Sequence, residues 1–289
     1  MILNYIKLFR LPQWIKNLFI FVPLVFSKHL FDKDYLIASI LAFFVFCFIT
    51  SVVYVINDIV DAESDRLHPK KKKRPIASGE IRTGPAIVAA SILFSTAVLL
   101  SFKLNLLFIS VVGLYFILNV LYSFVLKNIV LLDIFSIAAG FMLRVLAGAF
   151  VIDVSISSWL VLTTMFISLF LAVMKRRSEL NLVENTEFIA TRKVLQYYSR
   201  NFADQMATVA SAGVIICYAL YTVAERTLLI FHTDNLIYTT PFVVFGIFRY
   251  MFLVYMNQKG ENTIEIMITD PAMIINVLLY ILTTTLIIY

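Results

Sequence analysis

Three carboxylates end a hydrophobic stretch of this chain, and a block of cations follows them. Asp58, Asp61 and Asp65 fall within roughly a 60° arc on a continuous helix, because each residue turns the helix by ~100°. Carboxylate oxygens bind Mg²⁺ weakly unless phosphate oxygens complete its shell. The cations that could bind such a phosphate are Lys70, Lys71, Lys72, Lys73 and Arg74. The pattern therefore predicts a site for a diphosphate carried on Mg²⁺.

The composition indicates a membrane protein. Hydrophobic residues make up 61% of the 289 residues and charged residues 15%, and the mean hydropathy is +0.91. Soluble domains are apolar in only about half of their residues. Apolar runs long enough to cross the ~30 Å hydrocarbon layer lie at about 11–27, 36–57, 84–102, 105–126, 131–152, 156–174, 205–225, 237–255 and 270–288. The sequence thus predicts an all-α, polytopic membrane protein with nine transmembrane helices.

The first of these spans is the least regular. Gln13, Trp14, Lys16 and Asn17 interrupt its start, which is also typical of a helix that crosses the membrane only in part. The longest polar stretches, at about 58–83 and 175–204, are too short to form a core of their own. We therefore expect a single transmembrane domain over residues 1–289.

The distribution of positive charge predicts the orientation. Under the nine-span interpretation, most of the 24 Lys and Arg residues lie at the N-terminus and in the even-numbered loops. The N-terminus and the acidic site should therefore face the cytoplasm, at the plasma (inner) membrane. The net charge of +6 favours anionic lipid and phosphate, and no nucleic-acid partner is expected. Cys47 and Cys217 are single thiols within spans and indicate neither a disulfide nor a zinc site.

Polar residues inside the later spans indicate a polar cavity. A guanidinium within a span is costly and usually faces such a cavity, so Arg144 is a candidate for substrate binding. Asp133 lies eleven residues earlier on nearly the same helical face, roughly 16 Å away along the axis. Asn119, Tyr122 and Lys127 form a comparable polar edge on the fourth span.

Simpler interpretations exist for several of these residues. The cation block could be an anchor for anionic headgroups. Lys175 and Glu179 are spaced as a surface ion pair on a helix. His68 is the only histidine near the acidic motif, and a role for it as ligand or base is the weaker interpretation.

The acidic motif resembles that of a known family. Its pattern is Asn57-Asp58-x-x-Asp61-x-x-x-Asp65, followed by His68-Pro69 and by Arg74-Pro75-Ile76-Ala77-Ser78-Gly79. This resembles the first aspartate motif of the UbiA superfamily of intramembrane transferases. The resemblance implies nine helices around a central cavity that faces the cytoplasm, with Mg²⁺ held by Asn57, Asp58, Asp61 and Asp65 and binding the diphosphate of a donor.

The second motif departs from the usual superfamily pattern. Where that superfamily has another aspartate-rich motif after the sixth span, this chain has Lys175-Arg176-Arg177-Ser178-Glu179-Leu180. Together with three other segments, this motif resembles the decaprenyl-phosphate 5-phosphoribosyltransferases. The other segments are Arg10-Leu11-Pro12-Gln13-Trp14-Ile15-Lys16-Asn17, Leu132-Asp133 with Gly140-Phe141-x-Leu143-Arg144-Val145-x-Ala147-Gly148, and Phe245-Gly246-x-Phe248-Arg249-Tyr250.

This resemblance implies a reaction and a set of site residues. Such enzymes join phosphoribosyl diphosphate to a polyprenyl phosphate and release diphosphate, giving a lipid-linked phosphoribose for arabinose-type donors of the cell envelope. The extra phosphate at C5 of the donor suits a basic second motif. The catalytic candidates are Asp58, Asp61, Lys16 and Arg144. The candidates for substrate binding are Gln13, Lys16, Asn17, Lys70, Arg74, Asn119, Tyr122, Lys127, Asp133, Arg144, Lys175, Arg176 and Glu179.

Two alternatives belong to other functional classes. One is a UbiA-type prenyltransferase that uses a prenyl diphosphate and an aromatic acceptor, which a second aspartate motif would favour. The other is a lipid-phosphate carrier without catalysis, against which the intact Asp58, Asp61 and Asp65 argue. The sequence is compatible with a homo-oligomer.

Overall fold

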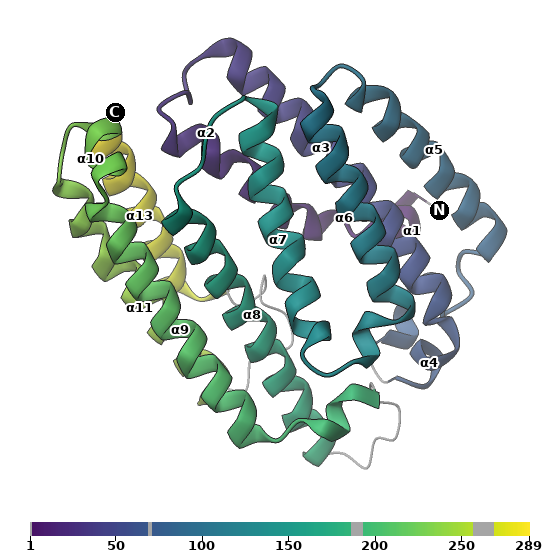
Figure 1. Ribbon diagram of the computed structural model, residues 1–289. Coiled ribbons are helices and arrows are strands. Elements are labelled where there is room, and N and C mark those ends of the chain that lie inside the picture. The colour runs from purple at the N-terminus through teal and green to yellow at the C-terminus, as the bar shows by residue number, and fades with distance from the viewer. Residues whose placement is uncertain (1, 69–70, 186–192, 257–268) are drawn as a thin grey trace. The chain divides into compact units, whose positions relative to one another are not determined.

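The chain is all-helical in the residues that the computed structural model describes, namely 2–68, 71–185, 193–256 and 269–289 (Figure 1). Contacts group the chain into two compact units. Unit 1 comprises Met1–Ser136 and Leu143–Ser155, and unit 2 comprises Ile137–Met142 and Ile156–Tyr289. The expected all-α membrane fold is confirmed. The single domain stays a prediction, and each unit is described by itself.

Eight helical segments in the described part of the chain are long and apolar enough to cross a membrane. They correspond to the second to ninth predicted spans. In order they are α3 (Lys33–Val60), α5 (Thr83–Ser101), α6 (Leu106–Phe124), α7 (Leu132–Val151), α8 (Ser158–Asn185), α9 (Arg200–Val223), η5 (Asn235–Thr239) with α11 (Thr240–Tyr255), and α13 (Pro271–Ile288). The count of nine and the orientation stay predictions.

The first predicted span is shorter than the others. It consists of a 3₁₀ helix, η1 (Leu11–Phe21), and the short helix α2 (Val22–Phe26), and it follows α1 (Ile2–Leu8). A 3₁₀ helix has three residues per turn, so Trp14, Asn17 and Ile20 lie on one face. The Trp14 indole donates a hydrogen bond to Ser51 Oγ (3.0 Å), and the Asn17 amide donates one to Cys47 Sγ (3.2 Å). The polar residues that interrupt the apolar pattern therefore attach η1 to α3.

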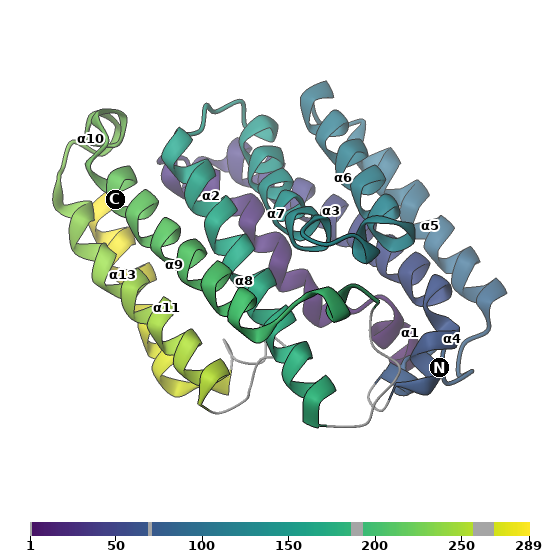
Figure 2. The same cartoon turned by 60° about the horizontal axis from the view of Figure 1, so that its bottom comes forward.

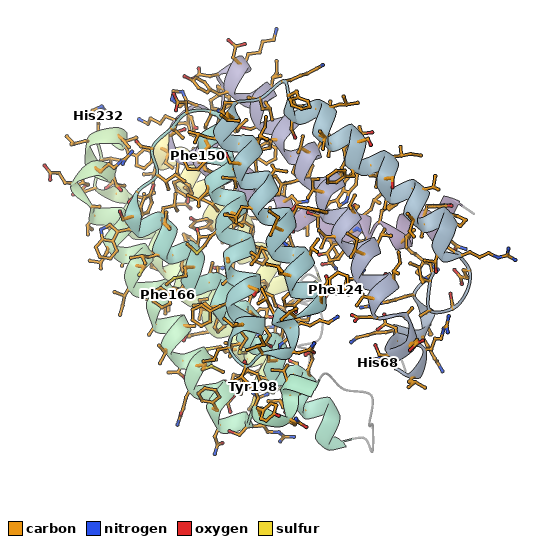
Figure 3. All side chains as sticks on the ribbon, turned by 45° about the vertical axis from the view of Figure 1, so that its right-hand side comes forward. His68, Phe124, Phe150, Phe166, Tyr198 and His232 are labelled. Carbon is orange, nitrogen blue, oxygen red and sulfur yellow. The ribbon has the colours of Figure 1, made fainter. Side chains whose placement is uncertain are left out.

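Helix α3 is the centre of unit 1. It packs against α5 and α6, which lie beside it in Figures 1 and 2. Figure 3 shows His68 and Phe124 toward one end of this unit and Phe150 toward the other. A buried apolar cluster joins η1 and α2 to α3, α5, α6 and α7, and its smallest side chains are Ala42, Ala97 and Ala147.

Gly148 allows η1 to approach α7 closely. A Cβ at Gly148 would lie 2.0 Å from the carbonyl oxygen of Ile20, which is a backbone atom. Arg144 precedes Gly148 by four residues and so lies on the same face of α7. Asn17 precedes Ile20 by one 3₁₀ turn and is, as shown below, a partner of Arg144. The glycine therefore sets the distance at which these two polar residues meet.

Replacing Gly148 with Ala should destabilise unit 1, because the new methyl group has no space beside the Ile20 carbonyl. Overpacking of this kind typically costs about 1–3 kcal/mol. We expect a lower unfolding temperature in detergent than for Gly113→Ala on α6, where a Cβ would meet nothing within 4 Å. Equal unfolding temperatures for the two variants would contradict the close approach of η1 and α7.

A second apolar cluster positions the loop after α3, and we call it the anchoring cluster. It consists of Leu8, Val52, Val55, Ile76, Ile81, Ala86 and Ala90, with Phe9 packed against it. The loop itself contains α4 (Ala62–Leu67) and the 3₁₀ turn η2 (Lys71–Lys73). Arg10 directly follows Phe9, and Arg74 comes two residues before Ile76. The same cluster therefore holds the two backbone segments from which Arg10 and Arg74 extend.

Unit 2 contains the remaining long helices. Helix α8 packs along α9, α9 contacts α11, and α11 contacts α13 (Figure 2). The close pairing of α8 and α9 depends on Gly213, because a Cβ there would lie 2.5 Å from the ring of Phe166. The shorter elements of this unit are η4 (Lys193–Tyr197) and α10 (Glu225–Phe231).

Candidate functional site: a charged cluster in unit 1

The three carboxylates keep helical spacing although α3 ends among them. Helix α3 ends at Val60 and α4 begins at Ala62, with Asp61 at the junction. The Asp61 N–H still donates to the Asn57 carbonyl (2.9 Å), and the Asp65 N–H donates to the Asp61 carbonyl (2.8 Å). The four-residue hydrogen-bond pattern therefore continues through the junction.

Two arginines meet the buried carboxylate of Asp58. Asp58 is only 2% exposed, and its Oδ1 accepts hydrogen bonds from Arg10 Nη2 and from Arg74 Nη1 (3.2 Å). Arg74 Nη1 also donates to Asp65 Oδ2 (2.5 Å), so this guanidinium bridges two of the three carboxylates. Among the described residues of the cation block, Arg74 turns inward, while Lys72 and Lys73 are exposed.

Asp61 has a different cation. Lys127, in the 3₁₀ turn η3 (Leu126–Asn128), donates to Asp61 Oδ1 (2.5 Å), and Asn57 Nδ2 donates to Asp61 Oδ2 (3.0 Å). Three carboxylates thus form ion pairs with Arg10, Arg74 and Lys127. These six side chains together carry no net charge, which makes their burial at the end of α3 tolerable.

One carboxylate oxygen in this cluster has no partner. Asp58 Oδ2 is buried and accepts no hydrogen bond. Within the described ranges, no group of three or more His, Cys, Asp or Glu side chains is arranged to hold a metal ion. Mg²⁺, however, commonly takes one or two protein carboxylates and completes its shell with substrate phosphates and water. The free oxygen of Asp58 fits such a site, and the predicted ligand set of Asn57, Asp58, Asp61 and Asp65 stays a prediction.

Arg144 belongs to a polar cluster between α7, α6 and η1. Its Nε donates to Asn17 Oδ1 (2.8 Å), its Nη2 donates to the Tyr115 hydroxyl (2.7 Å), and the side chain is 5% exposed. Thr50 also donates to Asn17 Oδ1 (3.4 Å). The buried guanidinium predicted for the membrane interior is therefore held by a neighbouring amide and a phenol.

Lys16 lies close enough to this cluster to be affected by its charge. Lys16 directly precedes Asn17, the partner of Arg144, and the positive charges of Arg144 and Arg10 repel its ammonium group. Like charges that repel in this way gain stability when an anion lies between them. The η1 segment and α7 thus form a cationic region suited to a phosphate.

The other candidates of unit 1 have different surroundings. The Asn119 amide donates to the Tyr115 carbonyl of its own helix (2.8 Å), and Tyr122 is half-buried. Asp133 is fully buried in the first turn of α7. Gln13 is tied through its backbone N–H to the Arg10 carbonyl (2.7 Å). Lys70 lies outside the described residues.

The second motif lies on α8 in unit 2. Arg176 is completely buried and forms an ion pair with Glu179 (2.6 Å), one turn along the helix. Arg177 Nε donates to Asp204 Oδ1 (2.8 Å), and its guanidinium stacks over the Tyr255 ring (3.9 Å to the centroid). Lys175 is half-buried. The motif therefore contains a buried arginine whose carboxylate partner is partly exposed.

Arg10 is the residue that sequence reasoning missed as part of the site. Its partner Asp58 lies 48 residues away, so no local pattern links the two. Its backbone has φ 50° and ψ 48°, a left-handed conformation that is uncommon outside glycine. His68, in contrast, accepts a hydrogen bond from the Lys71 N–H (3.3 Å) within its own loop.

The chain is similar in sequence to known proteins. The sequence model of the UbiA prenyltransferase family matches residues 18–267. The chain belongs to this family. Among UbiA members, a decaprenyl-phosphate phosphoribosyltransferase of Mycolicibacterium smegmatis is 36% identical over 220 residues, covering 75% of this chain and 69% of that protein. The protein of the same name from Mycobacterium tuberculosis strain H37Rv is 32% identical over 227 residues, covering 76% and 74%.

Solved structures of UbiA proteins show the same fold. The UbiA homologue of Archaeoglobus fulgidus, bound to geranyl diphosphate and Mg²⁺, has a TM-score of 0.70 with 18% identity, covering 99% of each chain. This likeness establishes an intramembrane UbiA fold for the chain.

Proposed function

We propose that this protein transfers the 5-phosphoribosyl group from phosphoribosyl diphosphate to a polyprenyl phosphate. The products are polyprenyl-phosphoryl-5-phosphoribose and diphosphate. The observation that carries the proposal is the replacement of the second aspartate motif by Lys175, Arg176 and Glu179, in a chain similar over three quarters of its length to enzymes named for this reaction. A donor with a phosphate at each end of the ribose needs cations there.

The charged cluster of unit 1 is suited to the diphosphate end of the donor. Asp58 would hold Mg²⁺ with its free oxygen, together with Asp61 and Asp65, and the metal would neutralise charge growing on the leaving group. Arg74 bridges Asp58 and Asp65 and can turn its remaining donors to phosphate oxygens. As the bond from ribose C1 to the diphosphate oxygen breaks, the electron pair leaves with diphosphate.

The acceptor needs orientation more than activation. A lipid phosphate is already ionised near pH 7, so its oxygen attacks C1 without a strong general base. Lys16 and Arg144 are our candidates for holding the acceptor phosphate or the ribose phosphate, because they form the cationic region of unit 1. We place Gln13, Asn17, Asn119, Tyr122, Lys127 and Asp133 around the same substrates.

A transfer assay tests the proposal. Purified protein with Mg²⁺, labelled phosphoribosyl diphosphate and a short polyprenyl phosphate should yield a labelled lipid and release diphosphate, and chelation of the metal should abolish both. Turnover of geranyl or farnesyl diphosphate with a phenolic acceptor, without the phosphoribosyl reaction, would instead establish the alternative prenyltransferase. A product that feeds cell-envelope sugar donors agrees with the proposed location in the plasma membrane.

The proposed orientation places the N-terminus and the acidic motif in the cytoplasm. Both cysteines are buried, so the natural chain offers little background to a thiol reagent that stays outside the membrane. Lys72→Cys, on the exposed part of η2, should be labelled in inverted vesicles and protected in intact cells. Labelling in intact cells would reverse the orientation.

Replacing Lys175 with Ala should weaken the binding of phosphoribosyl diphosphate much more than the binding of inorganic diphosphate. A lost charged hydrogen bond costs roughly 1.5–3 kcal/mol, and we assign this one to the ribose phosphate. Binding of both ligands, measured by calorimetry, checks the assignment, with the exposed Lys103→Ala as control. If the binding of both ligands is weakened equally, Lys175 binds the diphosphate end of the donor instead. Arg176 is less informative, because its removal leaves Glu179 without its buried partner.

A further inference from the structure

Arg10 holds Asp58 at the oxygen beside the one that is free. Asp58 Oδ1 accepts from both arginines, whereas Oδ2 accepts nothing. The other two carboxylates have their own cations in Arg74 and Lys127. Asp58 therefore has two guanidiniums at one oxygen and an oxygen without a hydrogen bond next to it.

The backbone around Arg10 is fixed by α3. Ser51 Oγ donates to the Phe9 carbonyl (2.9 Å), and the Trp14 indole donates to the same Ser51 oxygen (3.0 Å). Residues on both sides of Arg10 are thus tied to one hydroxyl, seven residues before Asp58 on α3. A left-handed backbone at a residue other than glycine persists only where its surroundings impose it.

The side chain of Arg10 is less enclosed than its partner. Its guanidinium lies over the Tyr54 ring (4.6 Å to the centroid), and the side chain is 23% exposed while that of Asp58 is 2% exposed. A guanidinium has five N–H donors in a planar fork. Donors that do not face Asp58 can therefore meet a second anion that arrives from the open side.

Charge balance links this second anion to the metal. The six ion-paired side chains are neutral without a metal, so a divalent cation alone would leave two uncompensated positive charges at a buried site. A diphosphate that enters with the metal restores the balance and offers acceptors to the guanidinium. The metal and the diphosphate should consequently bind together.

We propose that Arg10 is a substrate-binding residue that exchanges partners: it neutralises Asp58 in the empty site and donates to the diphosphate oxygens when Mg²⁺ takes Asp58. The inference rests on the diphosphate site of the proposed function and adds Arg10 to it. Arg10 then has two opposite effects. It weakens metal binding, because it competes with the metal for Asp58, and it strengthens diphosphate binding.

Binding measurements on the full-length protein in detergent test the exchange. The probes are Mn²⁺ alone, followed by electron paramagnetic resonance, and inorganic diphosphate with Mg²⁺, followed by calorimetry. For Arg10→Met we expect Mn²⁺ to bind at least ~3-fold more tightly than in the natural protein and diphosphate at least ~10-fold more weakly. Arg82→Met, an exposed arginine before α5, is the matched control and should change neither.

Other outcomes overturn the inference. Weaker binding of both probes would make Arg10 a structural residue of η1, and unchanged diphosphate binding would make it a counter-ion of Asp58 alone. If Arg10→Met fails to fold, Arg10→Lys decides: it should bind Mn²⁺ at least as tightly as the natural protein and diphosphate several-fold more weakly. Weaker Mn²⁺ binding by this variant contradicts the exchange. The assay contains neither ribose nor lipid, so its result is independent of which diphosphate donor the protein uses.

Discussion

Replacing Asp58 with Asn should lower turnover at least ~10²-fold while the protein remains folded in detergent. The substitution keeps the shape of the side chain but removes the charge that two guanidiniums share and the buried oxygen that fits a metal. Steady-state kinetics at saturating Mg²⁺, with the unfolding temperature as a check on folding, measure the effect.

The matched control for Asp58 is Glu63→Gln on α4. Glu63 is an exposed carboxylate five residues away, so its loss changes the local charge equally without touching the cluster. We expect turnover within about twofold of the natural protein for this variant. Asp61→Asn should resemble Asp58→Asn, since it removes the partner of Lys127. Near-normal turnover for both aspartate variants would contradict the assignment of the metal and the diphosphate to this site.

Replacing Arg144 with Lys should lower turnover by at least ~10-fold although the charge is kept. A single ammonium cannot reproduce the planar fork that reaches Asn17 and Tyr115 in different directions. Arg144→Met should be inactive and also less stable, because Asn17 and Tyr115 each lose a hydrogen bond from a charged donor, which costs roughly 1.5–3 kcal/mol.

Tyr115→Phe distinguishes a role of Arg144 in substrate binding from a role in supporting η1. It removes one partner of the guanidinium and leaves its charge in place, so we expect a stability loss of about 1 kcal/mol with turnover largely retained. Parallel kinetic and thermal measurements on the three variants distinguish substrate binding from support of η1. Full activity of Arg144→Lys would show that the residue only holds the helices together.

The features that could be predicted from the sequence are those with local causes. The spacing of Asp58, Asp61 and Asp65 follows from helical periodicity, which survives the junction after Val60. The eight long helices follow from runs of apolar residues. Arg74 was among the candidates for substrate binding, and the loop turns that residue toward the carboxylates.

The features that could not be predicted depend on distant contacts. The η1 segment is polar at Trp14 and Asn17 because these residues bond to α3, 37 and 30 residues later. Arg10 meets Asp58 only once that attachment has formed. The need for Gly148 becomes visible only when the Ile20 carbonyl occupies the space of its missing Cβ. Tertiary packing, rather than propensity, decides each of these points.

The anchoring cluster has a consequence for how this family can change through evolution. Arg10 and Arg74 extend from backbone segments that one set of apolar side chains supports. A substitution that changes the side-chain volume at Val52 or Ile76 therefore displaces both arginines at once. Substitutions in this lipid-sheltered interior therefore alter recognition of a phosphorylated ligand that they never touch. Resistance to a competitive inhibitor of the site can consequently arise from the substitution of one apolar residue by another in the cluster. A search limited to residues that contact the ligand would miss such a position.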